Sequence, residues 1–424
     1  MNKFTNIQDF LSFVENQKRF HEKKSLDNMK FYCEVFNNPQ NKFKTIHVTG
    51  TNGKGSVVSY LKNMFLEHGF SVGTFTSPYI TKFNERICYN QSMIEDEEVL
   101  FFANKILEKY PLFLEKTGET PSFFEFITLL CFLYFENKQP DISIIEVGIG
   151  GTLDSTNVIT PIVSTITNVS FDHMNVLGNS LEEILSNKLG IVKKNIPFVV
   201  GLKDANLIEI AEKKSSQLNS KIYKPLLGAF EIKKCDLEST QILSNEFGEY
   251  EITLPGIHQV ENSLVAIQTF LVALTILNKT PDFDKVKIGL LKTKWPGRLE
   301  VISREPLIVL DGGHNVDGVN RVCEFVDVLK YSTKRCIFAC SDNKEKEKMI
   351  GLLEPHFDQI IITSFTYKRH SSAKELFDYS KHDNKILMED IDEIIEFVQN
   401  KPYELNLFLG SLYFVSEIRP KLKK

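Results

Sequence analysis

Residues 44–69, KTIHVTGTNGKGSVVSYLKNMFLEHG, decide the fold of this chain. The stretch begins as a short apolar run that breaks at Gly50, which is typical of a buried strand. A glycine-rich turn follows, and then an amphipathic segment whose apolar residues recur at helical spacing: Val57, Val58, Leu61, Met64 and Phe65. The pattern therefore predicts a strand, a tight turn and a helix.

The turn GTNGKGS, residues 50–56, has the features of a phosphate-binding loop. Glycines let the backbone turn tightly and direct N–H groups at phosphate oxygens, and the helix N-terminus adds its dipole. Lys54 can neutralise phosphate charge, and the Ser56 hydroxyl can bind Mg²⁺. In the common pattern GxxxxGK[ST] the Lys directly precedes Ser or Thr, whereas here Gly55 intervenes, and an ordinary glycine turn is the alternative. The predicted loop comprises Gly50, Thr51, Asn52, Gly53, Lys54, Gly55 and Ser56.

The first half of the chain continues the same alternation of strands and helices. Residues 1–43 have helical spacing, FFEFITLLCFLYFEN (123–137) predicts a buried helix, and SLEEILSNKLGIVK (180–193) predicts a helix opened by Ser180. Strands are predicted in DISIIEVGIGG, PIVSTITNV and IPFVVG. Buried strands that alternate with helices indicate an α/β fold with a parallel, doubly wound sheet.

The rhythm changes twice further along the chain. Residues 226–254 predict a small antiparallel patch, and a second α/β rhythm begins near residue 300. Its predicted strands are PLIVLDGG, RCIFACS, QIIITSF, KILME and LNLFLG. The Pro–Gly break in KTKWPGRLE is the candidate boundary. We therefore expect two domains, residues 1–296 and 297–424.

Composition excludes several classes of protein. The chain has 424 residues, 42% hydrophobic and 25% charged, with a net charge of −5, so nucleic acid and anionic membranes are not expected partners. The seven cysteines include no CxxC pair, which argues against zinc and disulfides, and Cys336 and Cys340 are expected to be buried. The N-terminus lacks a secretory pattern, and apolar stretches such as ITLLCFLYF are too short to span a bilayer. These features predict a cytoplasmic, soluble protein, and without a coiled coil or repeat we expect a monomer.

Two further residues are candidate metal ligands. Glu146 follows an apolar strand, where an acidic side chain is costly to bury unless it has a partner. At the carboxyl end of a parallel strand it would face the ligand-binding edge of the sheet. His173, in SFDHMNVLG, could supply a second ligand through a neutral ring nitrogen. A capping carboxylate and a structural loop histidine are the alternative interpretations.

Ten segments together resemble the folylpolyglutamate synthase and dihydrofolate synthase family of Mur ligases. They are HVTGTNGKGS, TSPYITKFNERI, FFEFITL, EVGIGGTLDSTN, SFDHMNVLGNSLEEI, NKLGIVK, LPGIHQVEN, WPGRLE, LDGGHNVDG and LFLGSLYFVSEI, in that order. GTNGKGS is shared loosely across Mur ligases, whereas SPYITKFNERI and WPGRLE with LDGGHN are much narrower signals for the folate branch. The resemblance implies a P-loop ATPase-type domain with a small antiparallel element, followed by a Rossmann-like C-terminal α/β domain.

The resemblance also implies roles for individual residues. ATP would be held by the phosphate loop together with Asn262, Arg298 and Asp311. Ser77 and Glu146 match ligands of the Mg²⁺ between the phosphates, with Ser56, and His173 matches a ligand of a second metal ion.

The remaining implied roles concern the other substrates. Arg86, His314 and Ser411 match residues around the incoming L-glutamate, and Phe124 lies in the segment that resembles the pterin-side wall. Lys188 matches a lysine that is carbamylated in similar enzymes, although for a bare lysine in a helix surface exposure is the default. Two departures, Thr152 in place of a common arginine and the tract NKLGI in place of EKAGI, bear on substrate preference.

The expected function is therefore ATP-dependent addition of L-glutamate to folate through an acyl phosphate. The catalytic residues would be Lys54, Glu146, His173, Lys188 and His314. Dihydrofolate synthase, or an enzyme with both activities, is the alternative within the family. A peptidoglycan Mur ligase usually has an additional N-terminal domain, and only about 43 residues precede the first strand here. A P-loop ATP-binding regulator without ligase activity is the remaining alternative.

Overall fold

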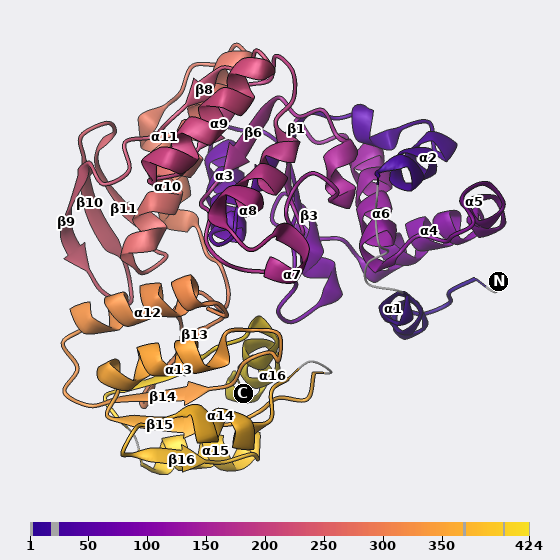
Figure 1. Ribbon diagram of the computed structural model, residues 1–424. Helices are drawn as coiled ribbons and strands as arrows, with labels where there is room; N and C mark the ends of the chain where they lie inside the picture. Colours follow the sequence, from indigo (N-terminus) through magenta and orange to yellow (C-terminus); the bar gives the residue numbers. More distant parts are fainter. Residues whose placement is uncertain (1–2, 18–24, 368–369, 402, 424) are drawn as a thin grey trace. The chain divides into compact units, whose positions relative to one another are not determined.

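The computed structural model describes residues 3–17, 25–367, 370–401 and 403–423. The chain forms two compact units that interleave along the sequence (Figure 1). Unit 1 comprises residues 1–169, 173–227 and 262–290, and unit 2 comprises residues 170–172, 228–261 and 291–424. The domain boundary predicted between residues 296 and 297 stays a prediction.

Unit 1 is built on an eight-stranded sheet in the order β4-β3-β2-β5-β1-β6-β7-β8. The strands from β2 to β8 in this order are parallel, and the edge strands β3 and β4 are antiparallel. Every residue of β1, β2, β5, β6 and β7 is buried, as helices on both faces of a parallel sheet require. The bounds are β1 Thr45–Thr49, β2 Val72–Phe75, β3 Ile87–Tyr89, β4 Ser92–Met93, β5 Ile142–Glu146, β6 Val163–Ile166, β7 Phe198–Val200 and β8 Ile222–Tyr223. The predicted doubly wound sheet is confirmed.

The helices of unit 1 begin at local signals in the sequence. Helix α6 starts with a capping box in which Ser122 and Glu125 satisfy each other's backbone N–H groups, and residues 124–135 are all buried. The other bounds are α1 Ile7–Asn16, α2 Asp27–Val35, α3 Lys54–Glu67, α4 Asp96–Leu107, α5 Tyr110–Thr117, α6 Phe123–Lys138, α7 Met174–Leu177, α8 Leu181–Lys188, α9 Ala205–Gln217 and α11 Phe283–Lys292. Short 3₁₀ turns are η1 Pro39–Asn41, η2 Phe83–Arg86, η3 Ser155–Val158 and η4 Leu189–Ile191.

Helix α10, Ile257–Ile276, belongs to both units because the division falls after Glu261. Among the described residues, α10 is one helix whose length and composition alone would allow it to cross a membrane. However, 72% of that stretch is buried inside the structure, which is what a core helix shows. No continuous apolar run marks this helix in the sequence, because His258, Gln259 and Glu261 interrupt its first turns.

Unit 2 contains two sheets. The predicted antiparallel patch is present as β9 Phe230–Cys235, β10 Thr240–Ser244 and β11 Gly248–Ile252, in the order β11-β10-β9. A six-stranded sheet has the order β12-β13-β17-β14-β15-β16, in which only β12 is antiparallel to its neighbour. Its strands are β12 Glu300–Arg304, β13 Leu307–Asp311, β14 Lys334–Phe338, β15 Gln359–Ile362, β16 Lys385–Leu387 and β17 Leu405–Leu409. The five predicted strands are confirmed, and β12 was not predicted.

The helices of unit 2 flank the six-stranded sheet. They are α12 Val316–Val328, α13 Lys346–Leu353, α14 Ala373–Tyr379, α15 Ile391–Asn400 and α16 Leu412–Leu422, with the 3₁₀ turn η5 Glu354–His356. Leu237, between β9 and β10, packs in the hydrophobic core of the six-stranded sheet, so the antiparallel patch and that sheet share one core.

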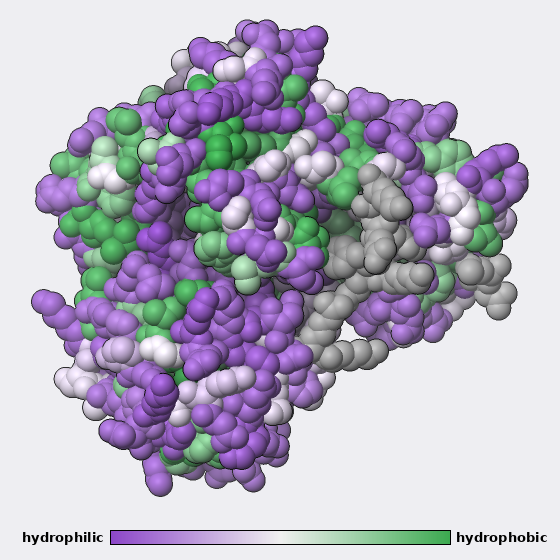
Figure 2. Space-filling view, in the orientation of Figure 1, coloured by the Kyte–Doolittle hydropathy of each residue, from purple (hydrophilic) through white to green (hydrophobic). Residues whose placement is uncertain are grey.

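The state of the cysteines and the polarity of the surface can be compared with what the composition predicts. All seven cysteines are free, and Cys336 and Cys340 are buried as predicted. On the face shown in Figure 2, hydrophilic residues cover most of the described surface, and hydrophobic residues lie in separated patches.

Candidate active site

The predicted phosphate loop connects β1 to α3 and requires glycine at two positions. Gly50 has φ +152° and Gly53 has φ +78°, and Gly53 is the N-cap of α3. A Cβ at Gly50 would lie 1.9 Å from Thr167 Oγ1, and one at Gly53 would lie 2.2 Å from Asn262 Oδ1. The loop therefore has the tight backbone and the helix N-terminus that anion binding uses.

The loop is fastened to the residues that follow β6. Thr51 N–H donates to the Asn168 carbonyl at 3.1 Å, and Asn52 N–H donates to Asn168 Oδ1 at 2.9 Å. Thr167 Oγ1 in turn donates to the Asn52 carbonyl at 2.6 Å. These bonds fix the loop at the carboxyl end of the sheet, where parallel sheets bind ligands.

Two lysines converge on this loop. Lys54 Nζ donates to the carbonyls of Gly50 and Thr51, each at 3.0 Å, and Lys188 Nζ donates to the same Gly50 carbonyl at 2.9 Å. Lys188 is 2% exposed, so the default of surface exposure does not hold for it. Both lysines thus direct positive charge at the loop, as the binding of an anion there requires.

The predicted metal ligands lie on neighbouring elements of unit 1. Ser56 is buried in the first turn of α3, and Glu146, at the end of β5, pairs in register with Val48 of β1. Glu146 is buried and its Oε2 accepts from the backbone N–H of Ser77 at 3.1 Å, so the structure brings these two predicted ligands together. His173 is the N-cap of α7 with φ +51°, and its carbonyl accepts from Val176 and Leu177.

The donor set fits a hard cation that keeps water and phosphate ligands. Within the described residues no three His, Cys, Asp or Glu side chains gather as a metal cluster. Mg²⁺ is commonly bound by one or two carboxylates together with substrate phosphates, so Glu146 and the Ser56 hydroxyl are compatible with it.

Two predicted substrate residues of unit 1 lie among aromatic rings. The Arg86 guanidinium lies 5.0 Å from the ring centre of Tyr79 and 5.4 Å from that of Phe123, and the residue is 6% exposed. Phe124 packs on Phe75 with ring centres 5.9 Å apart. A Cβ at Gly148 would lie 2.6 Å from the Phe124 ring, so glycine lets the ring approach the backbone.

A buried series of hydrogen bonds links His47 of β1 to Thr156 and Asp154, and the sequence did not predict it. Thr156 Oγ1 donates to Asp154 Oδ1 at 2.5 Å, so the His47 ring must donate its Nε2–H to Thr156 at 2.8 Å. Asp154 Oδ2 also accepts from the backbone N–H of Ile149 at 3.0 Å. Burial lowers the pKa of His47 to about 3, and nearby Lys193 adds to the effect. These hydrogen bonds attach the segment GIGGTLDSTN to strand β1.

The two departures from the family pattern contact each other. Thr152 Oγ1 donates to the Asn187 carbonyl at 2.9 Å, and Asn187 Oδ1 accepts from Gly151 N–H at 3.1 Å. They are therefore one local change in unit 1.

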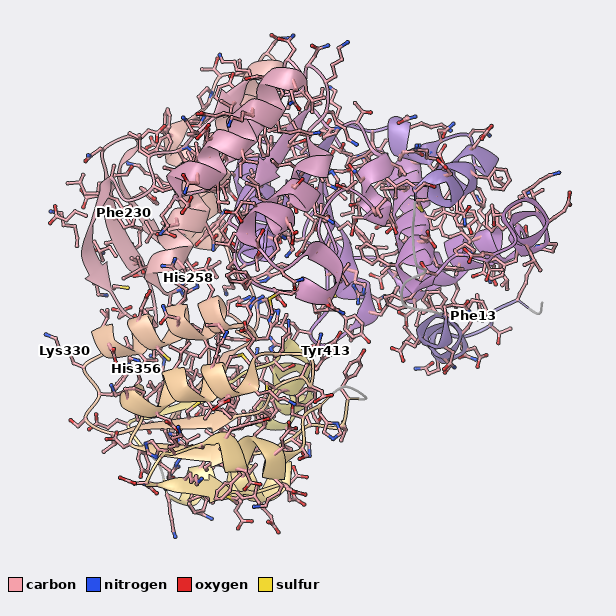
Figure 3. All side chains as sticks on the ribbon, in the orientation of Figure 1. Phe13, Phe230, His258, Lys330, His356 and Tyr413 are labelled. Carbon is pink, nitrogen blue, oxygen red and sulfur yellow. The ribbon has the colours of Figure 1, made fainter. Side chains whose placement is uncertain are left out.

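In unit 2, the predicted nucleotide-binding residue Asp311 lies at the end of β13, and Arg298 lies just before β12. Asp311 is 3% exposed and accepts backbone N–H bonds from Leu299 at 2.8 Å and Gly313 at 2.7 Å. Burial raises the pKa of Asp311, while the nearby Arg298 guanidinium and these hydrogen bonds oppose the rise. Arg298 therefore lies close enough to Asp311 to act on it electrostatically. Burial lowers the pKa of His258, at the start of α10 (Figure 3), to about 3.

Two residues of unit 2 that are predicted to bind the glutamate substrate, His314 and Ser411, lie just before the helices α12 and α16. His314 Nδ1 lies 2.9 Å from the Gly312 carbonyl, and its Nε2 lies 3.5 Å from Asp172 Oδ2. Ser411 is 2% exposed, is the N-cap of α16 and accepts from the backbone N–H of Tyr413 at 3.2 Å. The Tyr413 ring, which projects from α16 (Figure 3), stacks on Tyr367 at 3.9 Å.

Asp172, Asn315 and Lys344 were not predicted. Asn315 directly follows His314, and Asp172 directly precedes His173, so both lie in segments already quoted. Lys344 carries no local signal, because its partner Asp172 is 172 residues away in the sequence.

Comparison with known families agrees with this geometry. The Mur ligase middle domain matches residues 48–270, and the Mur ligase glutamate ligase domain matches residues 297–412. The dihydrofolate synthase/folylpolyglutamate synthase of Bacillus subtilis (strain 168) is 36% identical over 99% of this chain and 100% of the relative. The folylpolyglutamate synthase of Lacticaseibacillus casei is 32% identical over 91% of each chain.

Solved structures give the same assignment. Folylpolyglutamate synthase from Thermotoga maritima has a TM-score of 0.85 and 27% identity, covering 99% of this chain and 97% of that one. An FPGS–AMPPCP–folate complex has a TM-score of 0.82 and 28% identity over 99% of this chain and 100% of that one. The chain belongs to the folylpolyglutamate synthase and dihydrofolate synthase family of Mur ligases.

Proposed function

We propose that this protein is an ATP-dependent ligase that adds L-glutamate to the γ-carboxylate of folate. The observation that carries the proposal is the loop at residues 50–56, where Lys54 and Lys188 both donate to the Gly50 carbonyl. Full-length similarity to folylpolyglutamate synthases supports the folate as acceptor.

The chemistry requires activation of a carboxylate, because its oxygen is a poor leaving group in water. The γ-carboxylate attacks the terminal phosphorus of ATP, forming an acyl phosphate and releasing ADP. The glutamate amine then attacks the acyl carbon and passes through a tetrahedral intermediate. The amide forms, inorganic phosphate leaves, and the amine gives up its proton. The protein contributes mainly positioning and charge neutralisation.

Unit 1 supplies the groups for the phosphoryl transfer. The backbone of the loop at 50–56 and Lys54 bind the phosphates, and Asn262, beside Gly53, contacts the nucleotide. Ser56, Ser77 and Glu146 would hold Mg²⁺, with His173 at a second position; when bound, the ion supplies charge neutralisation at the phosphates. Phe124 forms part of the pterin wall, and Arg86 binds a carboxylate of glutamate.

Unit 2 supplies residues for nucleotide and amino acid. Arg298, held by Asp311, provides positive charge for ATP, and His314 and Ser411 orient the incoming glutamate. Lys188 is carbamylated in the active enzyme, which turns a buried cation into a carboxylate near the phosphate loop. We further propose that the protein acts as a cytoplasmic monomer.

A second activity is favoured by a specific observation. The Bacillus subtilis relative, similar over its whole length, bears the names of both dihydrofolate synthase and folylpolyglutamate synthase. Both reactions use the same acyl phosphate chemistry, so dihydropteroate is the second candidate acceptor. The Thr152–Asn187 contact, which departs from the family pattern, is the place to look for acceptor preference.

The test is glutamate-dependent phosphate release from ATP with purified protein, comparing tetrahydrofolate with dihydropteroate. Release with tetrahydrofolate alone makes the protein a folylpolyglutamate synthase, and release with both makes it bifunctional. Lys54→Ala should abolish release while the circular dichroism spectrum is unchanged. Release with neither acceptor, or full activity of Lys54→Ala, would overturn the proposal.

A further inference from the structure

Asp172 is the centre of a polar cluster in unit 2. Its Oδ1 accepts from Lys344 Nζ at 2.5 Å, and its Oδ2 accepts from Asn315 Nδ2 at 3.1 Å. The same Oδ2 lies 3.5 Å from His314 Nε2. The Asp172 and Lys344 side chains are each 8% exposed, so this ion pair is largely shielded from water.

The segment that carries Asp172 is held in unit 2 by these contacts. Residues 170–172 belong to unit 2, although the chain on both sides belongs to unit 1. Phe171 is 42% exposed, so its side chain is not what fixes the segment. The hydrogen-bonded carboxylate of Asp172 is the buried feature, and the donors Asn315 and Lys344 come from the start of α12 and from the loop before α13.

The hydrogen bonds set the orientation of the His314 ring. The Gly312 carbonyl can only accept, so Nδ1 carries a proton and donates to it at 2.9 Å. Nε2 is then the nitrogen that gains or lacks a proton, and it faces Asp172. Asn315, the next residue, reaches the same carboxylate and is itself the N-cap of α12 through Gly318 N–H. The imidazole is therefore held at Nδ1 by the Gly312 carbonyl, and its Nε2 can donate to Asp172 when the ring is protonated.

The charge on Asp172 is balanced by Lys344. Burial and the Lys344 ammonium lower the pKa of His314, whereas Asp172 raises it. Asp311 and His314 also interact electrostatically. Asp172 can accept a hydrogen bond from Nε2 only in the imidazolium form of His314, and Lys344 moderates how strongly the carboxylate favours that form.

We propose that Asp172 is a positioning residue for His314 in the glutamate step, with Lys344 and Asn315 fixing the Asp172 carboxylate. The inference rests on the proposed function, because His314 acts on glutamate only if the protein is a glutamate ligase. It adds Asp172, Asn315 and Lys344 to the residues of unit 2 that are predicted to act on the glutamate substrate.

The first test compares Asp172→Ala with the wild-type protein. We expect kcat/KM for glutamate to fall about 10²-fold, the cost of a misplaced reacting group, while the ATP dissociation constant stays the same. Acyl phosphate formation without glutamate, followed by positional isotope exchange in ATP, should also be unchanged. Asp392→Ala, which removes an exposed ion pair with Lys421 in the same unit, is the matched control and should leave kcat/KM unchanged.

The second test separates positioning from stability. In a His314→Ala background, Asp172→Ala should change kcat/KM by less than about two-fold, because the effects of residues that act together are not additive. The double variant Asp172→Asn with Lys344→Met removes both charges and should restore the melting temperature without restoring kcat/KM for glutamate.

The outcomes are distinct. No glutamate-dependent release by the wild-type protein would overturn both the proposed function and this inference. Wild-type release that Asp172→Ala leaves unchanged would overturn the inference alone. Recovery of kcat/KM together with melting temperature in the double variant would show that the ion pair serves only stability, and would also overturn it.

Discussion

Replacing Gly53 with alanine tests the phosphate loop and its neighbour Asn262 in one step. Gly53 has φ +78°, and an added Cβ would lie 2.2 Å from Asn262 Oδ1. The substitution therefore introduces a backbone cost and a steric cost. The two can be separated because a second glycine at the other end of α3 has only the first.

The magnitudes follow from the geometry. Alanine in the left-handed region costs about 1–2 kcal/mol, which lowers the stability of the folded protein. To reach an ordinary contact distance, Asn262 must move by about 1 Å, and a displacement of that size can cost up to about 10²-fold in the function of a site. Because Asn262 is proposed to contact ATP, we expect Gly53→Ala to raise the ATP dissociation constant roughly 10- to 100-fold.

Gly69→Ala is the matched control. Gly69 has φ +82°, and a Cβ there would meet nothing within 4 Å. It should show a similar loss of stability of about 1–2 kcal/mol, with unchanged ATP affinity. Isothermal titration calorimetry measures the affinity, and chemical denaturation measures the stability.

A double-variant cycle assigns the effect to Asn262. In an Asn262→Ala background the clash is absent, so Gly53→Ala should alter the ATP dissociation constant by no more than about two-fold. Wild-type affinity in Gly53→Ala, or equal losses of affinity in Gly53→Ala and Gly69→Ala, would refute the assignment of loop and asparagine.

Three further outcomes are expected. Lys188→Ala should abolish ligation, and added formate should partly restore it if a carbamate is the active form; retained activity in steady-state assays would exclude this role. His47 has its pKa lowered from 6.5 to about 3, so the unfolded chain binds the extra proton and stability falls as pH falls below 6.5. His47→Gln should remove about 1.4 kcal/mol per pH unit of that dependence in denaturation at pH 6 and pH 5, and parallel profiles would contradict it. Ser122→Ala should destabilise the protein by about 1 kcal/mol through its capping box with Glu125, measured by thermal unfolding, with unchanged ATP affinity.

Most elements of the fold could be predicted from local sequence patterns, namely apolar runs and helical spacing. The apolar strand before Gly50 and the helical spacing after it predicted β1, the loop and α3, because both elements depend on nearby residues. The buried helix α6 and the strands of the second sheet were predicted for the same reason. Strand β12 was missed because it follows a Pro–Gly break and is only half-buried.

Long-range packing accounts for what the sequence did not predict. The antiparallel patch shares a core with the six-stranded sheet through Leu237, and no local pattern indicates which sheet a buried leucine will contact. The burial of Lys188 depends on its bond to Gly50, 138 residues away. His47 looked like any residue of an apolar strand, and only its bond to Thr156 shows that it fastens a loop of the site.

The pair of lysines at Gly50 bears on the choice between a ligase loop and an ordinary glycine turn. Lys54 Nζ and Lys188 Nζ lie 3.0 and 2.9 Å from the same carbonyl oxygen, so the two ammonium groups are within about 6 Å of each other. At an effective dielectric constant of about 20, two such charges repel by about 3 kcal/mol before neighbouring groups contribute. An ordinary turn gains nothing from that repulsion, whereas a bound phosphate, or a carbamate on Lys188, turns it into attraction. Both ammonium groups would attract a phosphate bound at the loop, which is the electrostatic property that a site for ATP phosphates requires.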